Sequence, residues 1–158
     1  MYKKIRIKLL FLFLVYYSNT NMGISLKCGA TKSHFSYRVW DNFRIAMSQA
    51  CMQYIKNCEE NTNSLILTNI TYPCNQDTYD LLDYLTFIIK NIESIKNIGI
   101  IGIYYLLIIS DKGYYTYEKS KDILDTIQLL SPYIDKDINL YTNLFEKSFQ
   151  EKQNVYIL

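Results

Sequence analysis

The sequence predicts an all-α fold, a four-helix bundle with a long disulfide-tethered loop between its first two helices. Three observations predict this fold. Apolar residues recur every three or four positions in four separate segments, which is the period of one face of a helix. Glycine and proline are scarce, with 5 and 2 in 158 residues. Three of the four cysteines lie at the end of the first segment and in the stretch that follows it.

The N-terminus has the layout of a secretory signal peptide. Basic residues at positions 3–8 precede the apolar run Leu9–Tyr17, and polar residues follow. A membrane span takes about 20 apolar residues, so we expect a cleaved signal over residues 1–22 and no stable membrane insertion. An uncleaved anchor is the alternative. Residues 23–158 then form one domain, and the protein is expected to be secreted and extracellular.

The first helix is predicted from an apolar stripe that runs from Phe35 to Tyr54. No glycine or proline interrupts Phe35–Cys58, and Ser33 or Ser36 is placed to cap the start. We expect the stripe, and Trp40 beside it, to pack in the core.

The cysteines are expected to form disulfides, since their number is even and a signal peptide precedes them. Zinc is less favoured, because the chain lacks Cys-x2-Cys pairs and has a single histidine. In an intact first helix the Cα atoms of Cys51 and Cys58 are about 10 Å apart. A disulfide spans at most about 7 Å. We therefore expect Cys74 to pair with Cys51 or Cys58, and Cys28 to take the remaining one.

The stretch after Cys58 is predicted to be an exposed loop. It carries the sequon Asn69-Ile70-Thr71 and ends near Pro73, so Asn69 is a predicted glycosylation site. Asp77 is the expected N-cap of a second helix, with Asp80 in its first turn. The apolar face of that helix comprises Leu81, Leu85, Ile88, Ile92 and Ile95.

The second half of the chain contains one ambiguous segment and two predicted helices. Ile98–Ser110 is almost wholly apolar, and its pattern allows a buried strand or a buried helix. A third helix is predicted over Glu118–Leu130 and ends before Pro132. A fourth is predicted over Asp137–Phe149, and residues 150–158 resemble a tail.

Nothing in the sequence indicates catalysis or a cofactor. The net charge of +2 gives no electrostatic case for nucleic acid. His34 is the only histidine, it lacks the context of a nucleophilic site, and no glycine-rich phosphate loop is present. We therefore predict a protein that is not an enzyme, with no cofactor and no metal site. Enrichment in Ile, Asn, Lys and Tyr is typical of an AT-rich genome, such as that of a parasite or a large DNA virus.

The order of features resembles the type I interferons of the avian kind, members of the helical cytokine superfamily. The resemblance rests on Cys28, a first helix, the pair in "CMQYIKNC", the "NIT" sequon and the run "DTYDLLDYLTFIIKNI". It covers less than half of the chain. No cysteine follows Cys74, and a fifth helix is missing, so the resemblance implies a shortened relative, of the kind that a virus could encode.

The resemblance implies a secreted ligand, mimic or decoy that binds a class II cytokine receptor, an interferon receptor, and modulates antiviral signalling. Arg38, Arg44 and Lys56 lie off the apolar face of the first helix and are the candidate receptor contacts. The alternative is a secreted or surface protein of an AT-rich parasite or virus with a structural or other host-binding role. A helical bundle would support the first interpretation, whereas a central β-sheet would favour the second.

Overall fold

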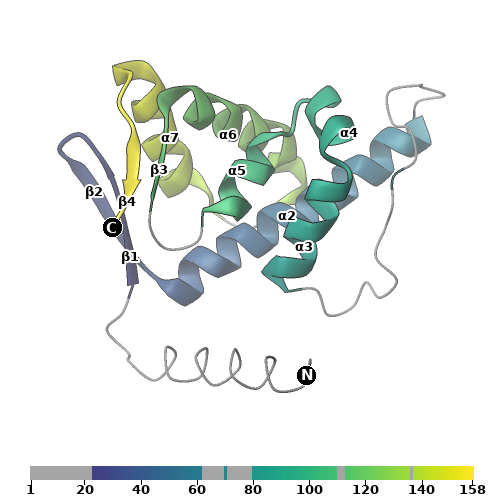
Figure 1. Cartoon of the computed structure of the whole chain (residues 1–158), viewed down its shortest axis with the longest axis horizontal. Coiled ribbons are helices and arrows are strands. Elements are labelled where there is room, and N and C mark those ends of the chain that lie inside the picture. The colour runs from purple at the N-terminus through teal and green to yellow at the C-terminus, as the bar shows by residue number, and fades with distance from the viewer. Residues whose placement is uncertain (1–22, 62–69, 71–79, 110–112, 136) are drawn as a thin grey trace, which may run out of the picture.

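The protein is described from a computed structural model, which covers residues 23–61, 70, 80–109, 113–135 and 137–158. The predicted signal peptide, Asn69 and Cys74 lie outside the described residues. The chain combines helices with a four-stranded antiparallel sheet, which stands at one end of the long helix α2 (Figure 1). The predicted all-α four-helix bundle is therefore wrong. Strands form at the two ends of the domain and at Gly113–Tyr115, where the prediction had none.

The sheet has the strand order β2-β1-β4-β3. Strands β1 (Gly23–Cys28) and β2 (Thr31–Ser36) form a hairpin in which Gly23 faces Ser36 and Cys28 faces Thr31. Strand β4 (Val155–Ile157) pairs with β1 on one side and with β3 (Gly113–Tyr115) on the other. The hairpin turn places Gly29 at a φ of 57°, a left-handed conformation that favours glycine.

Helix α2 (Tyr37–Asn61) confirms the first predicted helix and runs along the length of the molecule (Figure 1). The Ser36 hydroxyl accepts a hydrogen bond from the Val39 amide at 3.2 Å, as expected for a cap. Most of the predicted stripe is buried, and Trp40 is fully buried. Phe35 also faces the core, but it does so from β2 rather than from the helix.

The second predicted helix is divided in two, α3 (Leu81–Lys90) and α4 (Ile92–Asn97). Asp80, rather than Asp77, is the N-cap, and it forms a capping box with Asp83. The ambiguous apolar run contains a buried helix, α5 (Gly102–Ile108). Gly102 permits close packing against α6, because an added Cβ would lie 2.4 Å from the Asp122 carbonyl oxygen.

Helix α6 (Tyr117–Leu130) confirms the third predicted helix, and the 3-10 turn η1 (Ser131–Tyr133) follows at Pro132. Helix α7 (Asn139–Glu151) corresponds to the fourth. The interpretation of residues 150–158 as a tail is wrong, because Val155 and Ile157 are buried in the sheet. Helices α6 and α7 pack against the inner face of the sheet and join it to the rest of the core.

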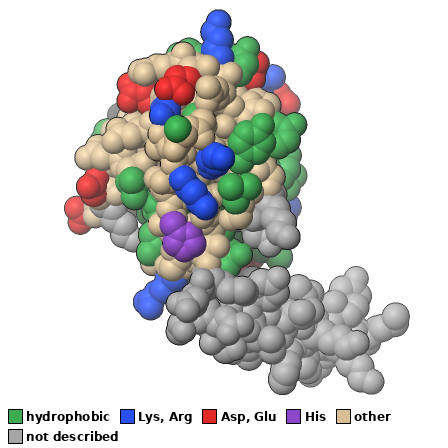
Figure 2. Space-filling view, turned by 90° about the vertical axis from the view of Figure 1, so that its left-hand side faces the viewer, with side chains coloured by type: hydrophobic (Ala, Val, Ile, Leu, Met, Phe, Trp, Pro, Cys, Tyr) green, Lys and Arg blue, Asp and Glu red, His purple; other side chains and the backbone are tan. Residues whose placement is uncertain are grey.

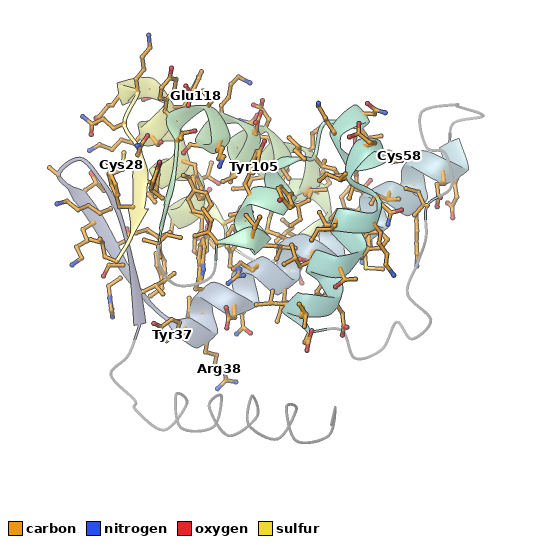
Figure 3. All side chains as sticks on the ribbon, in the orientation of Figure 1. Cys28, Tyr37, Arg38, Cys58, Tyr105 and Glu118 are labelled. Carbon is orange, nitrogen blue, oxygen red and sulfur yellow. The ribbon has the colours of Figure 1, made fainter. Side chains whose placement is uncertain are left out.

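No disulfide links Cys28, Cys51 and Cys58, the three cysteines within the described residues. Cys28 lies in β1, whereas Cys58 lies near the far end of α2 (Figure 3). Cys51 is buried in α2, one of the residues of the hydrophobic core. The expected pairing of Cys28 with Cys51 or Cys58 is therefore wrong, whereas the expected bridge from Cys51 or Cys58 to Cys74 lies outside the described residues. In the described part of the chain, Cys28 and Cys51 therefore contribute as small apolar core residues.

Candidate functional site

The three predicted receptor-contact residues all lie on α2 but do not form one surface. Arg38 is exposed in the first turn and points away from the body of the domain (Figure 3). Lys56 is exposed near the other end, about 27 Å away at the rise of a helix. Arg44, between them, is only 6% exposed. A partner of ordinary size would have to cover most of α2 to reach both exposed cations.

Arg44 joins α2 to α5. Its Nη1 lies 3.3 Å from Asp41 Oδ1, and its Nη2 donates to the Leu107 carbonyl oxygen at 3.1 Å. Burial lowers the pKa of Arg44, against the opposing effects of Tyr115 and Asp41. Burial also raises the pKa of Asp41, although Arg44 opposes that shift. These contacts give Arg44 a role in holding the helices together, and its side chain is not available to a partner.

His34, the only histidine, lies in β2 next to a serine of β1. The Ser25 hydroxyl and His34 Nδ1 are 3.0 Å apart. The other ring nitrogen lies close to Gly23, where an added Cβ would come within 2.8 Å of it. No carboxylate orients this ring among the hydrogen bonds of the described residues, as a nucleophilic serine–histidine site requires. The pair is therefore a cross-strand contact and gives no reason to propose an enzyme.

The outward side of the sheet is the surface that sequence analysis missed. We call it the outer sheet face and define it by its exposed side chains, which are Lys27, Lys32, His34, Tyr114, Tyr156 and Leu158. Residues opposite each other in an antiparallel pair lie on the same face. Lys32 faces Lys27, Lys27 faces Tyr156, and Tyr156 faces Tyr114. One row of two lysines and two tyrosines therefore crosses all four strands.

The two tyrosines of this row are unusually exposed for large aromatic residues. Tyr114 is 51% exposed and Tyr156 is 46% exposed, and their ring centroids are 5.8 Å apart. Leu158, also on this face, is 59% exposed. Figure 2 looks onto this side and shows basic side chains and the histidine near the centre, hydrophobic side chains beside them, and acidic ones toward the margins. Exposed aromatic rings gathered on one face are typical of a binding surface.

The two lysines lack a paired acidic side chain in the part of the chain that the structure describes. Neither Lys27 nor Lys32 forms an ion pair with another described residue. Like charges directly opposite each other on a sheet are destabilising. The fold thus holds two positive charges side by side without local compensation, an arrangement that a bound anion would relieve.

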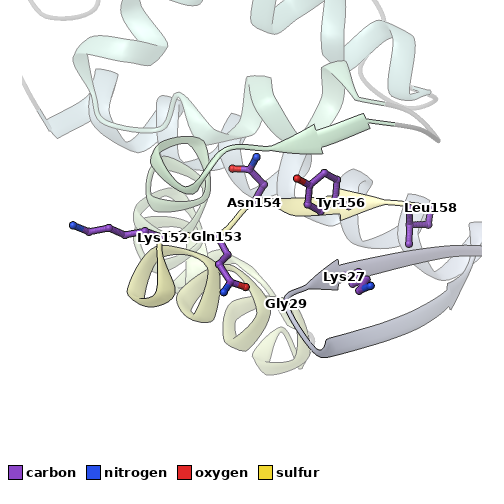
Figure 4. A pocket seen from close by; sticks show the side chains of 7 residues that line it. All are labelled: Lys27, Gly29, Lys152, Gln153, Asn154, Tyr156 and Leu158. Carbon is purple, nitrogen blue, oxygen red and sulfur yellow. The ribbon is translucent and has the colours of Figure 1, made fainter.

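A groove lies at one end of this face, between the hairpin turn and the connection from α7 to β4 (Figure 4). Its volume is about 540 Å³. The lining residues are Lys27, Gly29, Lys152, Gln153, Asn154, Tyr156 and Leu158. Lys27, Tyr156 and Leu158 belong to both the groove and the outer sheet face, so the two form a continuous surface.

The end of α7 positions the amide-bearing wall of the groove. Lys152 ends the helix in the left-handed conformation with a φ of 50°. The main-chain amide of Gln153 donates to the main-chain carbonyl oxygen of Ser148 at 3.1 Å. The Ser148 hydroxyl donates back to the main-chain carbonyl oxygen of Gln153 at 2.5 Å. Gln153 then packs over Gly29, where an added Cβ would lie 2.4 Å from its Oε1. The left-handed conformations of Lys152 and Gly29 together let the side-chain amide of Gln153 lie over the sheet.

Two other kinds of site are absent from the part of the chain that the structure describes. No group of three or more His, Cys, Asp or Glu side chains there is placed to hold a metal ion. None of the helices in that part is both long and apolar enough to span a bilayer. The outer sheet face and its groove are therefore the strongest candidate site.

The likeness of this chain to other proteins was tested in three ways. Comparisons with protein-family models, with curated proteins and with solved structures found no match. The geometry of the outer sheet face and the groove is consequently what bears on its function.

Proposed function

We propose that this protein is a secreted or surface protein that binds a negatively charged partner on host cells through its outer sheet face. Binding would be its activity, with no chemical step. This is the host-binding role that the sequence left open as an alternative, now assigned to a particular surface.

One observation carries the proposal, the row Lys32–Lys27–Tyr156–Tyr114 across the sheet. Two lysines opposite each other destabilise a sheet, and exposed tyrosines lower the solubility of the domain. Because neither feature stabilises the isolated domain, a ligand explains their arrangement better than stability does. The lysines supply attraction to an anionic surface, and the tyrosines supply contact area at little cost in conformational entropy.

The interferon-like interpretation is not carried forward as the proposed function. It depended on an all-α bundle, and the sheet contradicts that fold. Its candidate contacts on α2 are separated along the helix, and Arg44 is buried. A receptor protein would therefore have to bind a surface other than the one predicted.

Binding to intact cells tests the proposal. The labelled full domain, residues 23–158, should bind cells at physiological salt, and the double variant Lys27→Gln/Lys32→Gln should lose most of that binding. The matched control is Lys90→Gln/Lys96→Gln, which removes the same charge from exposed positions of α3 and α4, away from the sheet. Absence of binding by the unmodified protein, or an equal loss in both double variants, would overturn the proposal.

A further inference from the structure

We propose that the ligand of the outer sheet face and its groove is a sulfated polysaccharide of the cell surface. The inference rests on the proposed function, because it names the chemistry of the partner. It is argued from the functional groups that the groove offers, from those that it lacks, and from the place of its strands in the sheet.

The groove offers cations, amides and an aromatic ring. Lys27 and Lys152 bring ammonium groups, Gln153 and Asn154 bring amides, and Tyr156 brings a half-exposed ring. None of the seven lining side chains is acidic. Glu151 lies next to the groove, but its carboxylate is 3.7 Å from Lys147 Nζ. The lining therefore favours a ligand that is anionic and rich in hydroxyl groups.

The strands beneath the groove offer no free edge to a peptide. An extended peptide is usually held by main-chain hydrogen bonds along the free edge of a strand. Gly29 and residues 152–154 line the groove from outside the strands, and its other lining residues belong to or adjoin β1 and β4, the two inner strands of the order β2-β1-β4-β3. These two strands have partners on each side, so their amide and carbonyl groups are already used in the sheet. Over the strands, recognition must come from side chains, which suits a polysaccharide better than an acidic protein segment paired along a strand.

The arrangement of the row also fits a chain of sugar rings. Strands are about 4.8 Å apart, so the four residues from Lys32 to Tyr114 span about 14 Å. The two lysines occupy one half of this span and the two tyrosines occupy the other. The apolar faces of pyranose rings can lie on the tyrosines while sulfate groups of the same chain reach the lysines. A single-stranded nucleic acid has comparable chemistry, so it is the competing ligand in the test.

The direct experiment measures binding of the domain to heparin, to chemically desulfated heparin, to single-stranded DNA and to polyglutamate over a range of NaCl concentrations. Heparin should bind most tightly, and loss of sulfate should weaken binding by about tenfold or more, because fewer counterions are released. Lys27→Gln/Lys32→Gln should lower the affinity for heparin about tenfold and flatten its salt dependence. The control Lys90→Gln/Lys96→Gln should change neither.

The tyrosines need a separate comparison, since charge alone does not test ring contact. Tyr156→Phe keeps the ring and should retain heparin binding, whereas Tyr156→Ala should weaken it several-fold. Circular dichroism and thermal melting check that each variant is folded. Equal loss in Phe and Ala variants would overturn the stacking contact, and equal binding of sulfated and desulfated heparin would overturn the ligand class.

The two proposals fail in different ways. If enzymatic removal of sulfated polysaccharides from cells leaves lysine-dependent binding intact, the polysaccharide is wrong and the proposed binding face stands. If single-stranded DNA or polyglutamate binds as tightly as heparin, the ligand class is likewise wrong. If heparin binds but the lysine variants behave as the control does, the ligand has been placed on the wrong surface.

Discussion

Replacing Lys32 with glutamate should make the protein more stable while removing its binding activity. Lys32 and Lys27 are direct cross-strand neighbours. Ser25 exchanges both backbone hydrogen bonds with Leu158, at 3.0 and 2.9 Å, so the backbone groups of Ser25 point toward β4. Because backbone groups alternate in direction along a strand, those of Lys27, two residues later, also point toward β4 and not toward β2. Lys27 and Lys32 therefore form a non-hydrogen-bonded pair, in which the side chains are closest.

The magnitude follows from two contributions of the same sign. Lys32→Glu removes a repulsion and adds an attraction, and each is worth a few tenths of a kcal/mol to about 1 kcal/mol on a sheet surface. The free energy of unfolding should therefore rise by about 0.5–1.5 kcal/mol. For a domain of this size, that corresponds to an increase in Tm of roughly 2–6 °C.

Urea denaturation of four proteins isolates the interaction, namely the unmodified domain, Lys27→Gln, Lys32→Glu and the double variant. Stabilisation by Lys32→Glu should largely vanish when Lys27 is glutamine, and it should shrink in 0.5 M NaCl, where screening is strong. Lys32→Gln should fall between the unmodified protein and Lys32→Glu. A coupling energy of zero between positions 27 and 32 at low salt would refute the reasoning.

Three further predictions address the core. Tyr115→Phe should leave stability at pH 7 unchanged or raise it by about 1 kcal/mol, because the buried hydroxyl forms no hydrogen bond with any described residue. Burial raises the pKa of Tyr115 above that of an unfolded tyrosine, so the folded state loses stability as the pH rises beyond about 10. Urea denaturation at pH 7 and at pH 10.5 should show a smaller loss of unfolding free energy in the Phe variant. Equal losses in the two proteins would contradict this. Ile157→Ala should lower the free energy of unfolding by about 2–4 kcal/mol, whereas Leu158→Ala, at an exposed neighbour, should lower it by less than about 0.5 kcal/mol. An effect of Ile157→Ala no larger than that of Leu158→Ala would show that β4 is not part of the core. Burial raises the pKa of the Cys51 thiol, so iodoacetamide should label it only after unfolding, and fast labelling of the native protein would contradict its place in the core.

The helices were predictable because each has a buried face with a helical period. The stripe from Phe43 to Met47 and Ala50 lies on one side of α2, and Ile123 and Ile127 lie on one side of α6. The break between α3 and α4 was not predictable from this pattern. It falls at Asn91, whose side chain donates to the Phe87 carbonyl oxygen at 2.8 Å and which is itself buried. A polar residue within an apolar period carries no signal that reveals such a bend.

The strands were missed although their buried and exposed residues also alternate regularly along the sequence. In β1, Ile24 and Leu26 are buried and Lys27 is exposed, and in β4 Val155 and Ile157 flank exposed Tyr156. This is the alternation of a half-buried strand. It was overlooked because each run is short and lies at an end of the domain, where a linker or a tail is the usual expectation. Gly29, between two such runs, was the one available sign of a hairpin.

The missed strands and the missed site have one physical cause. A pleated strand sends alternate side chains to opposite faces. A strand placement that buries Ile24, Leu26, Val155 and Ile157 therefore necessarily directs Lys27 and Tyr156 outward. Once the core faces of β1 and β4 are fixed, the exposed row cannot be rearranged without exposing the core, since a shift of one residue would exchange the two faces. A flexible loop could relax two repelling lysines, whereas this sheet holds them together beside two exposed rings. The hydrophobic packing of the domain therefore preorganises the surface that we propose binds its ligand.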